Sequence, residues 1–271
     1  MAPRLKPCSV VGKRQPKLDA PLKVTGRSLF TDDIRLPGML YAKIVRSTIP
    51  HGKITDIDTS RAAQLPGVKA IITHRDCNGI MIGPDQQLLC DETVNYIGDE
   101  VAAVAATDEA TAAEAAELIQ ISYEKLPALL TITEATAPDA PTLNPYYDDN
   151  YADDRTTVLG DPDKAFENVD HIRIDEFSAR PNHNCFAELH TTVADFSLPD
   201  KLSIWTPTQT ATLFQKDLAQ KLGLSESNVR VCCLNTGGAF SGRVSVKPHH
   251  VIAALLSRKT GRPVSYIADS D

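Results

Sequence analysis

The sequence has no long apolar stretch and no excess of basic residues. No run approaches 18 consecutive apolar residues, so we expect no transmembrane helix. There are 28 Lys and Arg residues against 35 Asp and Glu residues, a formal net charge of -7. This balance argues against nucleic acid or an acidic membrane surface as a general partner. Residues 1–17 are basic and contain proline but no apolar segment, so they do not predict a secretory signal.

Sequence patterns for metal binding and nucleophilic catalysis are also missing. None of the six cysteines forms a C-x-x-C pair, and no iron–sulfur or zinc-ribbon spacing is present. No Ser-His-Asp or Cys-His arrangement is found, so we assign no catalytic residue and no direct metal ligand to this chain. We expect the cysteines to be buried free thiols, which fits a reducing, cytoplasmic compartment. They are Cys8, Cys77, Cys90, Cys185, Cys232 and Cys233.

What the sequence does have is the composition of a globular protein, with 42% hydrophobic and 23% charged residues over 271 positions. Segment 134–155 interrupts this composition with three prolines and five aspartates. We predict an N-terminal extension at 1–17, a first domain at 18–133, a linker at 134–155 and a second domain at 156–271. Tyr146, Tyr147 and Tyr151 leave open that the linker wraps a partner instead of only connecting the domains.

The first domain has an α+β pattern. Short β-rich runs at 40–45 and 68–73 flank a helical turn at 58–64, and EVAAVAA at 100–106 predicts a buried strand. The alanine-rich stretch 107–119, which Thr107 or Asp108 can cap, predicts a helix lying on the sheet. A further strand is predicted at 119–123.

The second domain is also predicted to mix helices and strands. We expect a short helix at 161–169 and strands at 171–178, 191–197, 202–206 and 229–234. Helices at 210–223 and 250–260 end at Gly223 and Gly261. A final strand is predicted at 263–267, and the sequence leaves open whether its sheet neighbours lie in this chain or in another polypeptide. The apolar face of the helix at 210–223 is predicted to consist of Leu213, Phe214, Leu218, Ala219 and Leu222.

A glycine-rich turn, TGGAFSGR at 236–243, follows the strand at 229–234. Gly237, Gly238 and Gly242 would let the backbone approach a ligand closely, with N–H groups directed at it. The turn matches neither the P-loop nor the dinucleotide-binding fingerprint. A plain tight turn explains the glycines equally well.

Other polar residues are candidates for a site. Gln209 stands between a strand and a helix, where its amide can reach a ligand or satisfy the helix end. Glu188 lies in the polar cluster NHNCFAELH at 182–190, and a buried carboxylate there must find a partner or define a site. The two histidines of this cluster match no standard zinc spacing. Solvation or helix capping is expected for His249 and His250.

Together these segments resemble the molybdenum-binding large subunit of the xanthine dehydrogenase and aldehyde oxidase family. The first domain is similar to the family's α/β hammerhead domain, and the second to the first part of its molybdopterin-binding α/β domain. The matches follow the family's order over nearly the whole chain. They include DAPLKVTG (19–26), FTDDI (30–34), LPGML (36–40), PHGKI (50–54), YIGDEVA (96–102), YEKLP (123–127) and TGRPV (260–264).

The resemblance implies a cofactor and roles for site residues. The cofactor is a molybdopterin carrying molybdenum, in the cytosine dinucleotide form in many bacterial members, with [2Fe–2S] clusters and FAD on other subunits. The implied reaction hydroxylates or dehydrogenates an aldehyde or an aromatic N-heterocycle. Gln209 would hydrogen-bond a molybdenum oxo ligand, and Glu188 and Phe240 would lie at the substrate pocket. The residues implied at the cofactor in the turn are Gly237, Gly238, Ala239, Phe240, Ser241, Gly242 and Arg243.

The chain departs from the family in its turn, which usually reads Gly-Gly-Gly-Phe-Gly-Gly-Lys. Ala239, Ser241 and Arg243 replace two glycines and the lysine, and Ala or Ser is strained wherever φ is positive. The resemblance places the general-base glutamate on a second molybdopterin-binding subunit, so this chain would be one part of a split large subunit, inactive alone. The alternatives are a non-catalytic structural or assembly subunit, and a truncated fragment with an exposed apolar edge at 264–267.

Overall fold

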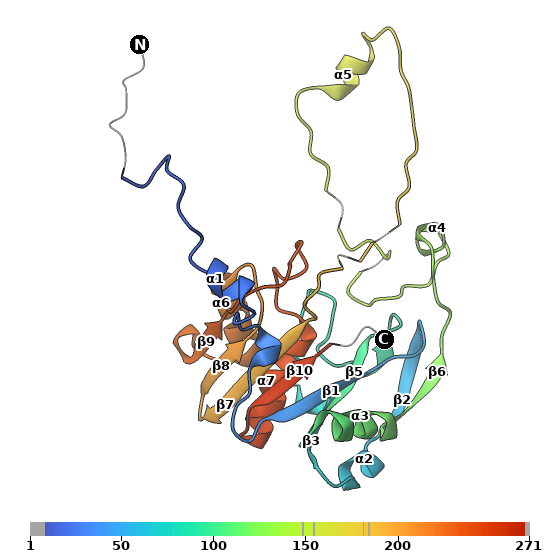
Figure 1. The fold of residues 1–271 in the computed structure, drawn as a ribbon. Coiled ribbons are helices and arrows are strands. Elements are labelled where there is room, and N and C mark those ends of the chain that lie inside the picture. Colours follow the sequence, from blue (N-terminus) through green and yellow to red (C-terminus); the bar gives the residue numbers. More distant parts are fainter. Residues whose placement is uncertain are drawn as a thin grey trace.

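The computed structural model describes residues 9–268 except Asn78, Asp148, Asp154, Pro181 and Asn184. Its core is a seven-stranded sheet in the order β3-β5-β1-β10-β7-β8-β9, next to a three-stranded sheet in the order β4-β2-β6 (Figure 1). The first sheet consists of β3 (Val68–Thr73), β5 (Glu100–Ala106), β1 (Leu40–Arg46), β10 (Val264–Ile267), β7 (Thr191–Leu198), β8 (Lys201–Trp205) and β9 (Val229–Cys232). No helix of the described residues is long and apolar enough to span a bilayer.

Strand β10 lies in the middle of the seven-stranded sheet. Its Val264 pairs with Leu40 in a parallel ladder with β1 and with Ala194 in an antiparallel ladder with β7. The sheet neighbours of this strand therefore lie in this chain and not in another polypeptide, and Val264 is completely buried. The exposed apolar edge predicted for a truncated fragment is not present at 264–267. Because β10 joins strands from both sides of the predicted linker, the two halves of the chain share one sheet.

Strand β5 is buried on both faces, which explains why its sequence does not alternate between polar and apolar residues. All seven residues are buried, because helices cover both faces of the sheet. Ala103 and Ala105 pack in the cluster that contains helix α7 (Pro248–Thr260), whereas Ala102 and Val104 pack against α2 (Ser60–Gln64) and α3 (Glu109–Leu118). Successive side chains of a strand point to opposite faces, so each face receives small residues that let a helix approach closely. As predicted, Asp108 caps α3, accepting a hydrogen bond from the backbone N–H of Thr111.

The three-stranded sheet was largely missed in the sequence. It consists of β2 (Gly52–Asp58), β4 (Thr93–Val94) and β6 (Gln120–Lys125). Strand β2, GKITDID, carries a glycine, two aspartates and mostly part-exposed side chains, so its β signal is weak. Its stability comes from long-range pairing with β6, which a local pattern does not reveal.

Helix α6 (Ala211–Leu222) covers the far end of the seven-stranded sheet and ends, as predicted, at Gly223, whose φ is +66°. Phe214, Leu218, Ala219 and Leu222 are buried on it, but Leu213 is 66% exposed, so its predicted place on the apolar face is wrong. The remaining helical segments are short. They are α1 (Ala20–Val24), α4 (Ile132–Ala135), α5 (Pro162–Phe166) and three 3-10 turns, η1 (Thr31–Asp33), η2 (His74–Asp76) and η3 (Glu226–Asn228).

Residues 155–185, which we call the arm, extend away from both sheets (Figure 1). The predicted helix at 161–169 forms as α5, but the strand predicted at 171–178 is wrong, because the described residues of the arm include no strand. Expectations for the cysteines also hold only in part. Cys77 and Cys90 are buried free thiols, whereas Cys185 and Cys233 are exposed.

Candidate functional site

Gln209 and the glycine-rich turn, which begins 27 residues later at Thr236, lie side by side. The backbone N–H of Gln209 donates to the Arg243 carbonyl at 3.0 Å, and the Thr208 hydroxyl donates to the same oxygen at 3.2 Å. The side chain of Gln209 is exposed and makes no hydrogen bond with any described residue. It does not cap α6, so its amide stays available to a ligand.

The backbone of the turn is strongly curved. Gly238, Phe240 and Ser241 have φ values of +110°, +39° and +64°, and the Gly242 N–H donates to the Ala239 carbonyl at 2.6 Å. Ala239 is not among the described residues with positive φ, so alanine there carries no such strain. Ser241 does occupy the left-handed region, which confirms the expected strain at that position. The Phe240 side chain is 69% exposed at the tip of the turn.

Replacing Ser241 by glycine is expected to raise the free energy of unfolding by about 1 kcal/mol, because glycine occupies the left-handed region without strain. Urea unfolding of the purified chain measures the change. Ser245→Gly is the matched control, since Ser245 is exposed and is not among the positive-φ residues. It should leave stability unchanged or lower it slightly, and an equal gain in both variants would contradict the prediction.

Glu188 and Arg243 tie the turn to the segment that leads into β7. An Arg243 guanidinium nitrogen donates to Glu188 Oε2, and this oxygen also accepts from the Gly237 backbone N–H at 2.8 Å. The second guanidinium nitrogen donates to the backbone carbonyls of Glu188 and Leu189. Only 1% of the Arg243 side chain and 8% of the Glu188 side chain are exposed. Arg243 was predicted at the cofactor, but in this structure its guanidinium faces Glu188 and holds the turn in place.

Packing around this ion pair explains two of the glycines. A Cβ atom on Gly237 would lie 2.6 Å from the Cβ of Glu188, and one on Gly238 would lie 2.8 Å from the Cβ of Phe186. The Arg243 guanidinium stacks over the Phe186 ring, 4.5 Å from its centroid. The turn is therefore closed against residues 186–188 on one side, and its other side remains for a ligand.

Three histidines lie beneath the turn, in a cluster with Phe186 and Tyr266. His190 contacts Phe186 edge-on with centroids 4.9 Å apart, and His249 stacks on Tyr266 at 5.4 Å. The Lys247 backbone N–H donates to His250 Nδ1 at 2.8 Å, so the proton of the neutral ring is on Nε2, which donates to the Thr206 hydroxyl. His250 thus caps α7 as predicted, but both His249 and His250 are buried, so the expected solvation is wrong.

Burial governs the protonation of these histidines. Desolvation lowers the pKa of His250 to about 3 and that of His249 well below its usual value, and neighbouring histidines lower both further. The pKa of His190 is lowered as well, by burial and by the charge of Arg243. The cluster is therefore neutral at physiological pH and supplies no positive charge to the turn.

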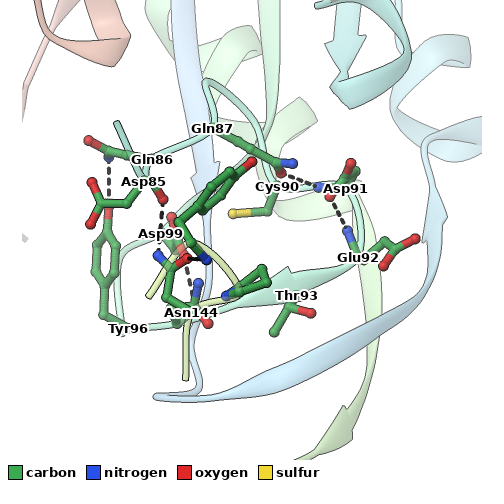
Figure 2. Close-up of a pocket in the computed structure, with 13 residues that line it drawn as sticks. Asp85, Gln86, Gln87, Cys90, Asp91, Glu92, Thr93, Tyr96, Asp99 and Asn144 are labelled. Atoms are coloured by element: carbon green, nitrogen blue, oxygen red, sulfur yellow. Dashed lines mark hydrogen bonds between the residues drawn. The ribbon is translucent and has the colours of Figure 1, made fainter. Parts of the chain in front are cut away.

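A second concave region lies away from the turn, where the loop 85–99 meets residues 144–146 (Figure 2). Its volume is about 420 Å³, and the Asn144 side chain closes one side by donating to the Asp85 carbonyl. No lysine or arginine lines it, and none of the predicted site residues does. Its acidic lining, which disfavours a phosphate-bearing ligand, consists of Asp85, Asp91, Glu92 and Asp99. No local pattern in the sequence indicates this cavity, because two distant loops form it.

Sequence comparisons identify both halves of the chain. Residues 25–127 match the sequence model of the aldehyde oxidase and xanthine dehydrogenase a/b hammerhead domain. Residues 144–271 match that of the molybdopterin cofactor-binding domain. The fold class predicted from the sequence, a hammerhead domain followed by molybdopterin-binding sequence, is confirmed.

Individual relatives and solved structures support the same domain assignment. The chain is 33% identical to the nicotinate dehydrogenase large molybdopterin subunit of Eubacterium barkeri over 97% of this chain and 62% of that protein. It is 32% identical to the xanthine dehydrogenase molybdenum-binding subunit of Escherichia coli O157:H7 over 92% of this chain and 35% of that protein. The crystal structure of quinoline 2-oxidoreductase from Pseudomonas putida 86 superposes with a TM-score of 0.86 at 28% identity, covering 95% of this chain and 34% of that chain.

The chain thus spans about a third of the length of most of these relatives. Its recognised sequence motifs, its two matched domains and its superposition on a solved oxidoreductase agree with one another. The chain belongs to the aldehyde oxidase and xanthine dehydrogenase family and corresponds to an N-terminal portion of its molybdenum-binding subunits.

Proposed function

We propose that this chain forms one wall of the molybdopterin site in a multi-subunit molybdenum oxidoreductase. The observation that carries the proposal is the position of Gln209, whose unpaired amide lies beside the curved backbone of the turn. The substrate class is an aldehyde or an aromatic N-heterocycle. Relatives named for nicotinate, nicotine and quinoline support the heterocycle.

The residues present fit an acceptor-rich cofactor. Within the described chain, the backbone N–H groups of Gly238, Ala239 and Ser241 donate to no other group. Together with the Gln209 amide they offer several donors on one side of the turn, which suits oxo and phosphate oxygens. When bound, the cofactor supplies two-electron oxidation of the substrate. The acidic cavity near Asp99 has four carboxylates and no lysine or arginine in its lining, which disfavours such oxygens.

The role of the chain's own residues is to bind the cofactor's acceptor oxygens and to orient the substrate. The Gln209 amide and the turn N–H groups hold acceptor oxygens, and the exposed Phe240 ring flanks the path of the substrate. The Glu188–Arg243 pair fixes the turn relative to β7. No residue of this chain is assigned as general base; that glutamate belongs to the part of the family subunit that a partner chain provides.

The proposed complex contains a second molybdopterin-binding subunit, a [2Fe–2S] subunit and an FAD subunit, with the cofactor in its cytosine dinucleotide form. The E. barkeri relative, of which this chain spans 62%, supports the existence of family subunits shorter than the others. Free thiols at Cys77 and Cys90 support a cytoplasmic location.

The second candidate is a non-catalytic assembly subunit that keeps the fold. Two observations favour it: Ser241 is in the left-handed region, and Arg243 is buried away from the open side of the turn. The molybdenum content of the complex purified through this chain distinguishes the two candidates. A complex free of molybdenum would contradict the catalytic proposal.

Replacing Gln209 by alanine in the assembled complex should lower kcat about 100-fold, because one donor aimed at the reacting centre is lost. Assembly and molybdenum content should not change, since the side chain contacts no described residue. Gln220→Ala, at an exposed position on α6, is the matched control and should keep full turnover. Unchanged turnover in Gln209→Ala would remove this side chain from the mechanism.

A further inference from the structure

The arm presents apolar side chains to solvent along its whole length. Every described residue from 155 to 185 is exposed. Leu159, Ile174 and Phe177 are 97%, 92% and 90% exposed. Apolar surface concentrated in one segment marks a site of interaction with another macromolecule. The other large apolar residues of the arm are Val158, Phe166, Val169 and Ile172.

One part of the arm, residues 171–178, has the pattern of a strand. It begins HIRID, so that polar and apolar residues alternate. Arg173 Nε donates to Asp175 Oδ1 at 3.0 Å. Side chains two residues apart meet on one face in an extended chain, which leaves Ile172 and Ile174 on the opposite face. The segment therefore resembles a strand that lacks a neighbour among the described residues.

We propose that residues 171–178 add as an edge strand to a sheet of the polypeptide that carries the rest of the family subunit. This inference rests on the proposed function, which requires such a polypeptide. In the solved relatives the region matched by this chain is about a third of one longer chain, so the larger part of that subunit is the natural occupant. Backbone pairing would provide the contact, and Ile172 and Ile174 would fill an apolar groove beside the edge.

The charge of the arm argues against a second copy of this chain as the occupant. Six acidic and four basic residues lie in the arm, between positions 155 and 185, a formal net charge of -2. Two arms placed together would repel each other, and each whole chain carries -7. The charge therefore favours a different chain as the occupant over a second copy of this one.

Hydrogen–deuterium exchange tests the strand directly. The tagged chain is purified from its source as a complex, the partner is identified by mass spectrometry, and the complex is compared with the chain alone. The amides of residues 171–178 should exchange at least ten times more slowly in the complex. Unchanged exchange in a complex that contains the rest of the family subunit would overturn the proposal. Protection of this segment by self-association of the isolated chain would also overturn it.

Variants test the side chains. The double variant Ile172→Lys and Ile174→Lys should bind the partner at least ten times more weakly. Leu18→Lys, at a position 95% exposed and outside the arm, is the control and should bind normally. Equal affinity of the double variant and the wild-type chain would overturn the proposal. Molybdenum analysis keeps this result separate from the function: a complex protected at 171–178 but free of molybdenum contradicts the proposed chemistry and leaves the strand contact standing.

Discussion

Replacing Arg243 by methionine is expected to lower the free energy of unfolding by about 3–5 kcal/mol. The substitution removes the partner of Glu188, whose carboxylate is almost completely buried. A buried charge that loses its partner keeps its desolvation cost, and this cost is larger than the contribution of an exposed ion pair. Methionine has a similar length, so cavity formation is a small part of the expected loss. Urea unfolding of the purified chain measures the effect.

Two comparisons establish the cause of this loss. Arg230→Met, at an exposed position in β9, should change stability by less than about 0.5 kcal/mol. The double variant Glu188→Gln and Arg243→Met should recover part of the lost stability, because the unpaired carboxylate is gone. A double variant less stable than Arg243→Met alone would show that the pair acts through packing rather than charge.

The same pair connects stability with the site. Oε2 of Glu188 accepts both the Arg243 guanidinium and the Gly237 N–H, so loss of arginine also frees the turn. Glu188 Oε1 and Arg243 Nε are buried without a hydrogen-bond partner among the described residues. The hydrogen-bonding capacity of the pair is thus incompletely satisfied among the described residues, which adds to the cost of losing the remaining bonds.

Local sequence signals predicted the elements that carry them. EVAAVAA predicted β5, because a run of small and branched apolar residues has few alternatives to a doubly covered strand. The alanine-rich helix α3 and the Gly223 end of α6 follow from propensity and positive φ. Strand β2 was missed because its stability depends on pairing with β6, which begins at Gln120, 62 residues after Asp58.

The site could be predicted only because the order of the motifs along the chain resembles that of a known family. Nothing local brings Gln209 to the turn; the hydrogen bond from its N–H to the Arg243 carbonyl depends on how β8 and β9 pair. The sequence did indicate that a buried Glu188 needs a partner, but Arg243 lies 55 residues away. A single sequence contains no signal that joins two such positions.

Stability is expected to fall steeply as the pH is lowered below about 6.5, because His249 and His250 are held neutral. In the unfolded chain both rings have pKa values near 6.5. In the folded chain the pKa of His250 is lowered to about 3, and that of His249 is also well below 6.5. Between these values the unfolded chain binds more protons, so acid favours unfolding. Each histidine contributes about 1.4 kcal/mol per pH unit, and together they contribute about 2.7 kcal/mol per pH unit.

Other groups titrate in the same range, so the test compares variants at equal pH. Burial raises the pKa of Glu100. A carboxyl group with a raised pKa stabilises the folded chain more as the pH falls, so its effect opposes that of the histidines. His249→Phe keeps a ring stacked on Tyr266 and removes one titrating group. Between pH 6 and 4.5 its unfolding free energy should depend on pH with a slope smaller by about 1.4 kcal/mol per unit. His171→Gln, in the exposed arm, should keep the wild-type slope. If His249→Phe also keeps it, then His249 is protonated in the folded chain, and the neutral cluster beneath the turn does not exist.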